Sequence, residues 1–447
     1  TGTNATAFWN TIFPFGFGFL PSAIATTGLL GTLVWIVFLA LFLTLGLRAV
    51  ARATENRSDR FVLVSTFFSA LFLWIASIVY TPSTVVLSFA FICTGLFISA
   101  TVLTGVIGTR TIVFNNSKLA HFVSVLLMLV LLVGIAVFGY LSSKKVLSLV
   151  HFQRAVVYSN TSGKGLDEIE TELGKAINLA PADSYWVAVS QVELARANAV
   201  LNDTKSSDKD KQTAFQNALS SSIAAIQNAI AINPSYNNLV ALGGIYASLV
   251  PAPFAVEGAY EGAINTYNLA VAKNPETPEV PLLLARVELD KKNIELARMR
   301  IKEALSKKQD YADAYFLQSQ LEIGQNNLTQ AIASAETGVV LSPGNAGVLF
   351  QLGFLKYSNR DFAGAVDALK KAIEILPGYA NAQYYLGLSL DALGQRDEAL
   401  SIFEDLAKTN PDNDLVKSAL ENLRAGKSAL SKTASTPTKT LSPLNGQ

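Results

Sequence analysis

Residues 380–411 read ANAQYYLGLSLDALGQRDEALSIFEDLAKTNP, and this stretch decides the fold of the C-terminal part of the chain. Leu386 and Gly387 fall in a first short helix, and Ala399 and Phe403 fall in a second one. Glycine and alanine are small, which suits two helices that approach closely. The stretch therefore predicts a helical hairpin that ends at Pro411.

The same hairpin recurs along the chain. Pro275, Pro343, Pro377 and Pro411 are separated by multiples of 34 residues, with Gln309 at the missing position. A fixed period of this length is typical of stacked helical repeats. Looser copies end at prolines 181 and 234, and they are followed by longer intervals of 53 and 41 residues. We assign the extra length to loops at residues 202–210 and 251–258.

The repeat unit resembles the tetratricopeptide repeat (TPR), and the resemblance covers residues 146–424. It implies a solenoid of about six to seven helix pairs, in which each pair buries its apolar face only on its neighbours. It also implies a binding scaffold for a protein or peptide, with a groove lined by the first helix of each pair. Residues 431–447 have almost no apolar content, which predicts a disordered tail.

The fifth positions of three consecutive units are Phe316, Phe350 and Tyr384. We predict that these rings line the groove and contact an extended peptide or a partner helix. The alternative is that they pack between repeats as part of the core. The second positions of the same units hold no Lys or Arg, so we do not expect capture of a C-terminal carboxylate.

The N-terminal part of the chain has the composition of a membrane protein. Half of the 447 residues are hydrophobic and only 15% are charged, against about 25% in soluble domains. Residues 1–141 hold six Lys or Arg and two Asp or Glu, whereas the remainder holds 29 and 32. Because the soluble part carries no basic patch, we exclude nucleic acid as a partner.

Residues 22–141 contain four stretches that are long and apolar enough to cross a bilayer, which takes roughly 20 helical residues. The expected fold is therefore all-α, with a domain of four transmembrane helices followed by the TPR solenoid. The membrane lipid bilayer is then the first partner of the chain. The four predicted spans cover residues 22–47, 61–80, 85–107 and 119–141.

The loops between these spans predict the orientation. Loop 48–60 has four Arg, and loop 108–118 has Arg110 and Lys118, while loop 81–84 is uncharged. Basic loops lie in the cytoplasm by the positive-inside rule. We therefore expect a protein of the plasma (inner) membrane with its repeats on the external or periplasmic face.

Residues 1–21 do not have the pattern of a signal peptide, and we interpret them as the end of an external loop. Phe17-Gly18-Phe19-Leu20, followed by Gly28-Leu-Leu-Gly31 and Trp35, resembles the O-antigen ligase and polymerase family, in which a large external loop re-enters the membrane. The resemblance covers residues 8–45. It implies that the chain is the C-terminal part of a longer envelope protein that uses lipid-linked glycans. The alternative is an ordinary amphipathic lead-in to the first span.

We expect no catalytic, cofactor-binding or metal-binding residue within residues 1–447. The family's functional His corresponds here to Phe17, so no catalytic residue can be transferred by resemblance. His121 and His151 are the only histidines, and we interpret both as structural; Cys93 is the only cysteine. Two hypotheses remain, namely the C-terminal part of a glycan ligase or polymerase and a non-enzymatic membrane-anchored TPR scaffold for envelope assembly.

Overall fold

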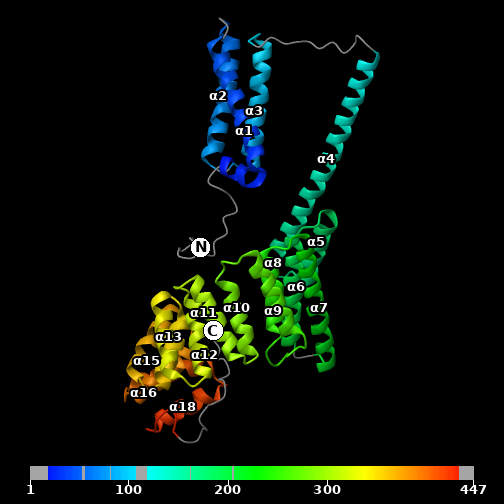
Figure 1. Ribbon diagram of the computed structural model, residues 1–447. Coiled ribbons are helices and arrows are strands. Elements are labelled where there is room, and N and C mark those ends of the chain that lie inside the picture. Colours follow the sequence, from blue (N-terminus) through cyan, green and yellow to red (C-terminus); the bar gives the residue numbers. More distant parts are fainter. Residues whose placement is uncertain are drawn as a thin grey trace. The chain divides into compact units, whose positions relative to one another are not determined.

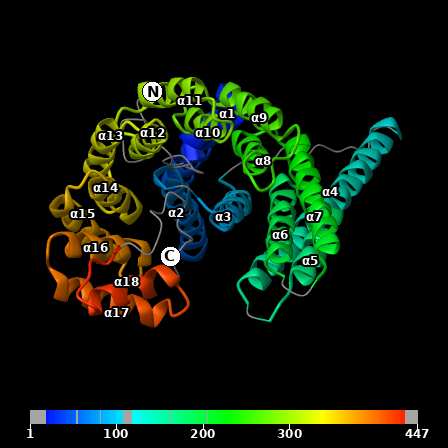
Figure 2. The same cartoon turned by 90° about the horizontal axis from the view of Figure 1, so that it is seen from below.

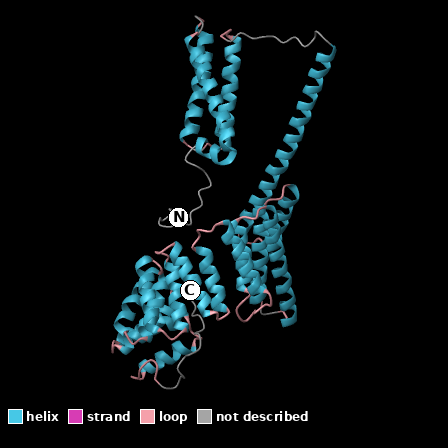
Figure 3. Cartoon of the chain, in the orientation of Figure 1, coloured by secondary structure: helices cyan, strands magenta, loops and turns pink. Residues whose placement is uncertain are grey.

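The computed structural model describes residues 19–52, 56–80, 82–106, 118–161, 163–203 and 206–431. The chain divides into two compact units, an N-terminal unit over Asn10–Phe138 and a repeat unit that contains Gly139–Gln447. Every regular element of the described residues is an α-helix (Figures 1 and 3). The predicted all-α fold is thereby confirmed.

In the N-terminal unit, α1 (Phe19–Ala51), α2 (Arg57–Val79) and α3 (Thr84–Leu103) pack around an aromatic core. The indole Nε1 of Trp74 donates a hydrogen bond to Oγ1 of Thr94 at 3.0 Å, which joins α2 to α3. Thr94 donates its own proton to the carbonyl of its helix four residues earlier. Polar groups between apolar helices are thus satisfied inside the bundle.

Four described helices are long and apolar enough to cross a membrane. This agrees with the predicted number of spans, although their bounds differ from the predicted ones. The loop with Arg110 and the lead-in before Phe19 lie outside the described residues. The apolar segments are Gly28–Ala51, Arg57–Val79, Val85–Leu103 and His121–Ser159.

The first apolar segment begins at a break inside α1. Gly28 has φ 68° and ψ −173°, a combination that is essentially restricted to glycine. The apolar helix therefore starts at Gly28, six residues after the start of the predicted span at Ser22.

The fourth apolar helix, α4 (Lys118–Ser159), is unbroken over 42 residues. The predicted span ends at Leu141 and the predicted solenoid begins at Val146, but the helix continues through both positions. Residues 142–145 are Ser-Ser-Lys-Lys. They mark the end of an apolar stretch, but Ser and Lys are tolerated inside a helix, and only Gly or Pro would have marked a helix end.

In the repeat unit, the helices after α4 follow one another in consecutive pairs (Figure 2). The end of α4 and α5 (Leu166–Leu179) form the leading pair, and α18 (Asp414–Arg424) closes the array. The six pairs between them are α6 (Asp183–Asn202) and α7 (Asp208–Ile232), α8 (Tyr236–Ser248) and α9 (Ala259–Lys273), α10 (Glu279–Asp290) and α11 (Ile294–Lys307), α12 (Ala312–Gly324) and α13 (Leu328–Leu341), α14 (Ala346–Ser358) and α15 (Phe362–Ile375), and α16 (Ala380–Ala392) and α17 (Arg396–Thr409).

The longer repeats take up their extra residues in two ways. The 41-residue interval has its extra length in the connection from α8 to α9, as predicted. In the 53-residue interval the extra residues instead extend the helices, because α6 has 20 residues and α7 has 25, against 14 in α15. The predicted polar loop at 202–210 is correspondingly shorter.

The small residues of the repeat pattern occupy the places where paired helices approach most closely. A Cβ added to Gly387 of α16 would lie 2.6 Å from the ring of Phe403 in α17, and one added to Gly353 would lie 2.5 Å from Leu369. On α15, which faces Gly353, Ala365 is fully buried. The repeat signature is thus a packing requirement of the hairpin.

Candidate partner-binding surface

Phe316, Phe350 and Tyr384 lie on the first helices of three consecutive pairs, α12, α14 and α16. Phe316 and Phe350 are half-buried and keep part of their rings accessible. Tyr384 is only 3% exposed, and its ring packs on Phe403 of α17 at a centroid distance of 5.6 Å. Burial raises the pKa of Tyr384 to about 12, because an apolar core disfavours the phenolate. Tyr384 is therefore a core residue, and the groove role stays a prediction for Phe316 and Phe350.

The ring contacts of Phe350 lead to a cluster that we call the aromatic patch, made of Phe350, Phe354, Tyr357 and Tyr385. The first three lie on α14 and are half-buried. Tyr385 of α16 contacts all three, with centroid distances of 6.1, 5.0 and 5.4 Å in that order. Tyr385 itself is 8% exposed, and the other rings pack on it in tilted or edge-to-face geometries, of which the edge-to-face one is favoured by aromatic pairs.

The sequence contained a signal for this patch. Phe350, Phe354 and Tyr357 are spaced by four and three residues, which places them on one face of a helix. A comparison of equivalent positions in different repeats finds Phe350 alone, because the other two rings have no aromatic equivalents in the neighbouring first helices. Reading successive turns of one helix would have found all three.

A buried amide lies next to the patch on α14. Gln351 is 7% exposed, and neither its Nε2 nor its Oε1 has a hydrogen-bond partner among the described residues. It precedes Phe354 by three residues, so both side chains leave the helix on neighbouring parts of the same face. An unpaired buried amide costs roughly 1–3 kcal/mol, and both polar atoms of Gln351 are enclosed by the protein.

Two surface pockets lie nearer the start of the repeat unit. One, of about 510 Å³, lies between α4, α5 and α6 and has mostly apolar walls, including Phe152, Ile169 and Val192. The other, of about 690 Å³, lies between α7 and the connection to α9, where Phe215 stacks on Phe254 at 5.2 Å. Both fall within the usual size range of ligand pockets, and their apolar walls suit contact better than proton transfer.

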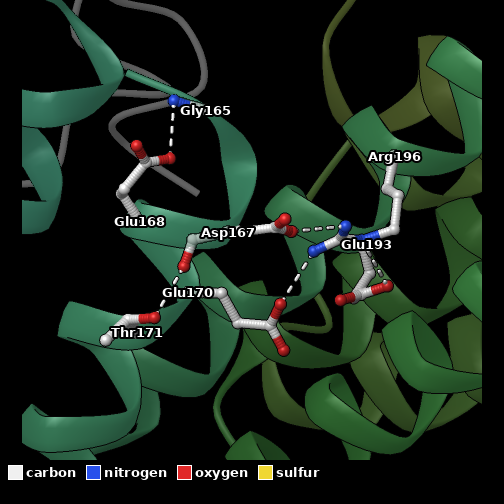
Figure 4. Close-up of polar contacts among 7 residues, drawn as sticks. All are labelled: Gly165, Asp167, Glu168, Glu170, Thr171, Glu193 and Arg196. Carbon is white, nitrogen blue, oxygen red and sulfur yellow. Dashed lines mark hydrogen bonds and ion pairs between the residues drawn. The ribbon is translucent and has the colours of Figure 1, made fainter.

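A cluster of four charged side chains joins α5 to α6 (Figure 4). The guanidinium of Arg196 bonds Asp167 at 2.8 Å and Glu170 at 2.7 Å, and it lies 3.6 Å from Glu193. The bond to Asp167 raises the pKa of Arg196, whereas burial raises the pKa of Glu193. All the contacts run between helices of the solenoid or along one of them, so the cluster fastens the first repeats together.

His151 has a carboxylate partner that the sequence analysis did not identify. Its Nδ1 lies 2.7 Å from Oε2 of Glu172, and Lys175 lies 2.5 Å from the other carboxylate oxygen. The hydrogen bond from His151 is the main cause of the lowered pKa of Glu172. The contact joins α4 to α5, while His121 is exposed on α4. Within the described ranges, no three His, Cys, Asp or Glu side chains are grouped so that they could hold a metal.

These helical hairpins form a TPR-like solenoid. Residues 282–346 and 356–423 match the tetratricopeptide repeat family. No curated protein matches the chain in sequence.

Several solved structures are similar to the chain. MamA is 22% identical, covers 39% of this chain and 90% of its own, and has a TM-score of 0.33. YrrB, described as a TPR protein with an unusual peptide-binding site, is 18% identical, with coverage of 44% and 98% and a TM-score of 0.35. PilF of Pseudomonas aeruginosa is 16% identical, with coverage of 54% and 100% and a TM-score of 0.39.

Proposed function

We propose that this protein is a membrane-anchored scaffold that holds a protein partner through its TPR domain. The tetratricopeptide repeats and the four apolar helices in one chain support this function. α4 supports the anchor in particular, because its 18-residue apolar window has no buried residue within the described chain. So large an exposed apolar surface is stable only in lipid or against another apolar helix.

The observation that carries the partner site is the half-exposed aromatic patch on α14. Aromatic side chains in a partly enclosed surface are the usual anchors of protein interfaces. The proposed partner is therefore an extended segment with apolar side chains, and Phe316 would extend the same surface onto α12.

A photo-crosslinking amino acid at position 354 tests this site in cells. We expect protein adducts from position 354 and none from position 340, where Val340 is 78% exposed on the second helix of its pair. Phe354→Ala should weaken the binding of the captured partner by roughly 1–3 kcal/mol, the range for the loss of an interface anchor. The same adducts from both positions would show that the patch is not the binding site.

A finer proposal keeps the O-antigen ligase or polymerase resemblance, with a lipid-linked glycan as a partner of a longer protein. It is supported by the break at Gly28, because the resembling segment has a glycine turn at this position before its next span. Phe17, at the position of the family's His, lies outside the described residues.

This finer proposal predicts glycan transfer by the natural full-length protein but not by residues 1–447 in nanodiscs. The substrates would be a panel of lipid-linked oligosaccharides with candidate acceptors. Transfer by residues 1–447 alone would contradict the expectation that they contain no catalytic residue, and no transfer by either protein would favour the non-enzymatic scaffold.

A further inference from the structure

At one position of its first helix the last repeat is buried, whereas earlier repeats are more open at the equivalent position. The ninth positions of successive first helices are 34 residues apart and provide an internal comparison. Arg286 and Gln320 are exposed and Phe354 is half-buried, but Leu388 is 5% exposed. Leu388 shares its buried cluster with Ala429, which follows the last helix. The burial of Leu388 therefore accompanies the packing of α18 and of the segment after it on the last repeat.

This segment turns back immediately after α18. Gly426 has φ 76°, the left-handed conformation that ends many helices. Its N–H bonds the carbonyl of Leu423 at 3.0 Å, and the N–H of Lys427 bonds the carbonyl of Asn422 at 2.9 Å. We call the residues that follow the turn, 427–430, the C-terminal hook.

The hook is held by α16 and α18 through its main chain. Oδ2 of Asp391 accepts a hydrogen bond from the Ala429 N–H at 2.8 Å and another from the Ser428 hydroxyl at 2.7 Å. Nδ2 of Asn422 donates to the Ala429 carbonyl at 3.0 Å. Both main-chain groups of Ala429 are thus paired with side chains, and its methyl group is 3% exposed. The N–H of Ser431 bonds the carbonyl of Ser428 at 2.8 Å, so the hook is a tight turn whose main chain is held by side chains of the solenoid.

We propose that the hook is an intramolecular ligand of the TPR groove, and that a peptide partner extending from the aromatic patch onto α16 must displace it. The inference rests on the proposed function of the patch. Asp391, which holds the hook, lies on the same helix as Tyr385 of the patch, so the hook and the patch share α16. Asp391 then has two roles in succession, because it binds the main chain of the hook when the groove is closed and the main chain of the partner when it is open.

Trypsin cleavage after Lys427 in the full chain tests whether the hook is docked. Asp391→Ala should accelerate this cleavage about 10- to 100-fold, because it removes the charged acceptor of two hydrogen bonds. Asp397→Ala, an exposed acid in the first turn of α17, is the matched control and should leave the rate unchanged. Equal rates in the wild type and in Asp391→Ala would overturn the proposal.

A second variant releases the hook but keeps Asp391. The double variant Ser428→Ala, Ala429→Pro removes both donors, and the probe is a fluorescein-labelled peptide of residues 425–431 (AGKSALS). We expect the probe to bind the double variant at least about tenfold more tightly than the wild type, whose site is occupied by its own hook. Adding Asp391→Ala should abolish this binding. Equal binding to all three proteins would show that Asp391 is no peptide site.

Crosslinking from position 354 separates the two proposals. If the hook competes with the partner, the double variant should give a several-fold higher yield of adducts than the wild type. An unchanged yield would make the hook a cap of the solenoid and overturn this inference, while the partner site stands. No adduct from either protein would overturn the partner site, and the competition with it.

Discussion

Four residues spaced one repeat apart share a left-handed backbone in the turn between paired helices. Lys292, Asn326, Arg360 and Gly394 have φ of 64°, 58°, 63° and 80°. This conformation costs roughly 1–2 kcal/mol for a residue with a Cβ, yet only one of the four is glycine. The packing of each helix pair determines this backbone and outweighs the local preference of the residue.

Gly394→Ala should lower the free energy of unfolding by about 1 kcal/mol. The cost is conformational, because a Cβ at this position meets nothing within 4 Å. Gly344→Ala is the matched control, since Gly344 also has open space around it but no positive φ. Gly394→Asn should cost less than Gly394→Ala, because Asn326 already adopts the same backbone. Chemical denaturation of the three variants measures the differences, and equal losses for Gly394→Ala and Gly344→Ala would contradict the account.

The charge cluster around Arg196 predicts a pH dependence. Burial raises the pKa of Glu193 above its ordinary value of 4.5. Such a group favours folding below that value, and its contribution is lost as the pH rises through the pKa of the folded state. Glu193→Gln should therefore stabilise the protein at pH 7, by on the order of 0.5 kcal/mol, and the gain should vanish below about pH 4. Glu170→Gln, which removes a direct partner of Arg196, should give no gain. Thermal melts between pH 3 and 8 measure both, and a gain for Glu193→Gln that grows at low pH would refute the assignment.

An ion pair with a buried carboxylate joins two neighbouring repeats. Glu322 of α12 is 1% exposed, and its carboxylate binds the guanidinium of Arg298 in α11. Asn327 donates to the other carboxylate oxygen at 3.2 Å. A buried carboxylate is tolerated only while such partners remain, so this contact sets the register between two consecutive helix pairs.

Arg298→Ala should destabilise the repeat unit by about 3–5 kcal/mol, because it leaves the charge of Glu322 buried without its cation. Arg300→Ala, two residues along the same helix, removes only the more exposed pair with Glu303 and should cost less than about 1 kcal/mol. Urea denaturation of both variants provides the comparison. Removing both partners in Arg298→Met, Glu322→Leu should recover most of the loss, and failure to recover it would mean that packing rather than charge causes the loss.

At the scale of the whole molecule, a single chain combines exposed apolar helices with a helical solenoid. The apolar surface of α1 to α4 requires a lipid or protein environment, whereas the repeats carry their own cores. The side of the membrane on which the repeats lie stays a prediction from the basic loops, and part of those loops lies outside the described residues.

Protease added to intact cells or spheroplasts should digest the repeat unit, because both basic loops are predicted to be cytoplasmic. A cytoplasmic protein serves as the control for intact membranes. A repeat unit that is cut only after lysis of the inner membrane would reverse the predicted orientation and place the groove in the cytoplasm.

The all-α class, the 34-residue hairpins and the number of apolar segments could be derived from the chain alone, because each is recorded as a spacing of residue types along it. The accessible part of the candidate site could not. Tyr384 and Phe350 occupy equivalent positions, yet Tyr384 packs on Phe403 and is 3% exposed, while Phe350 packs on Tyr385 and stays half-buried. The contact of His151 with Glu172 and the return of the hook to Asp391 likewise join residues 21 to 38 positions apart. Burial and hydrogen bonding depend on neighbours that only folding brings together. A periodic pattern therefore predicts on which helix face a side chain lies, but not which residues bury it.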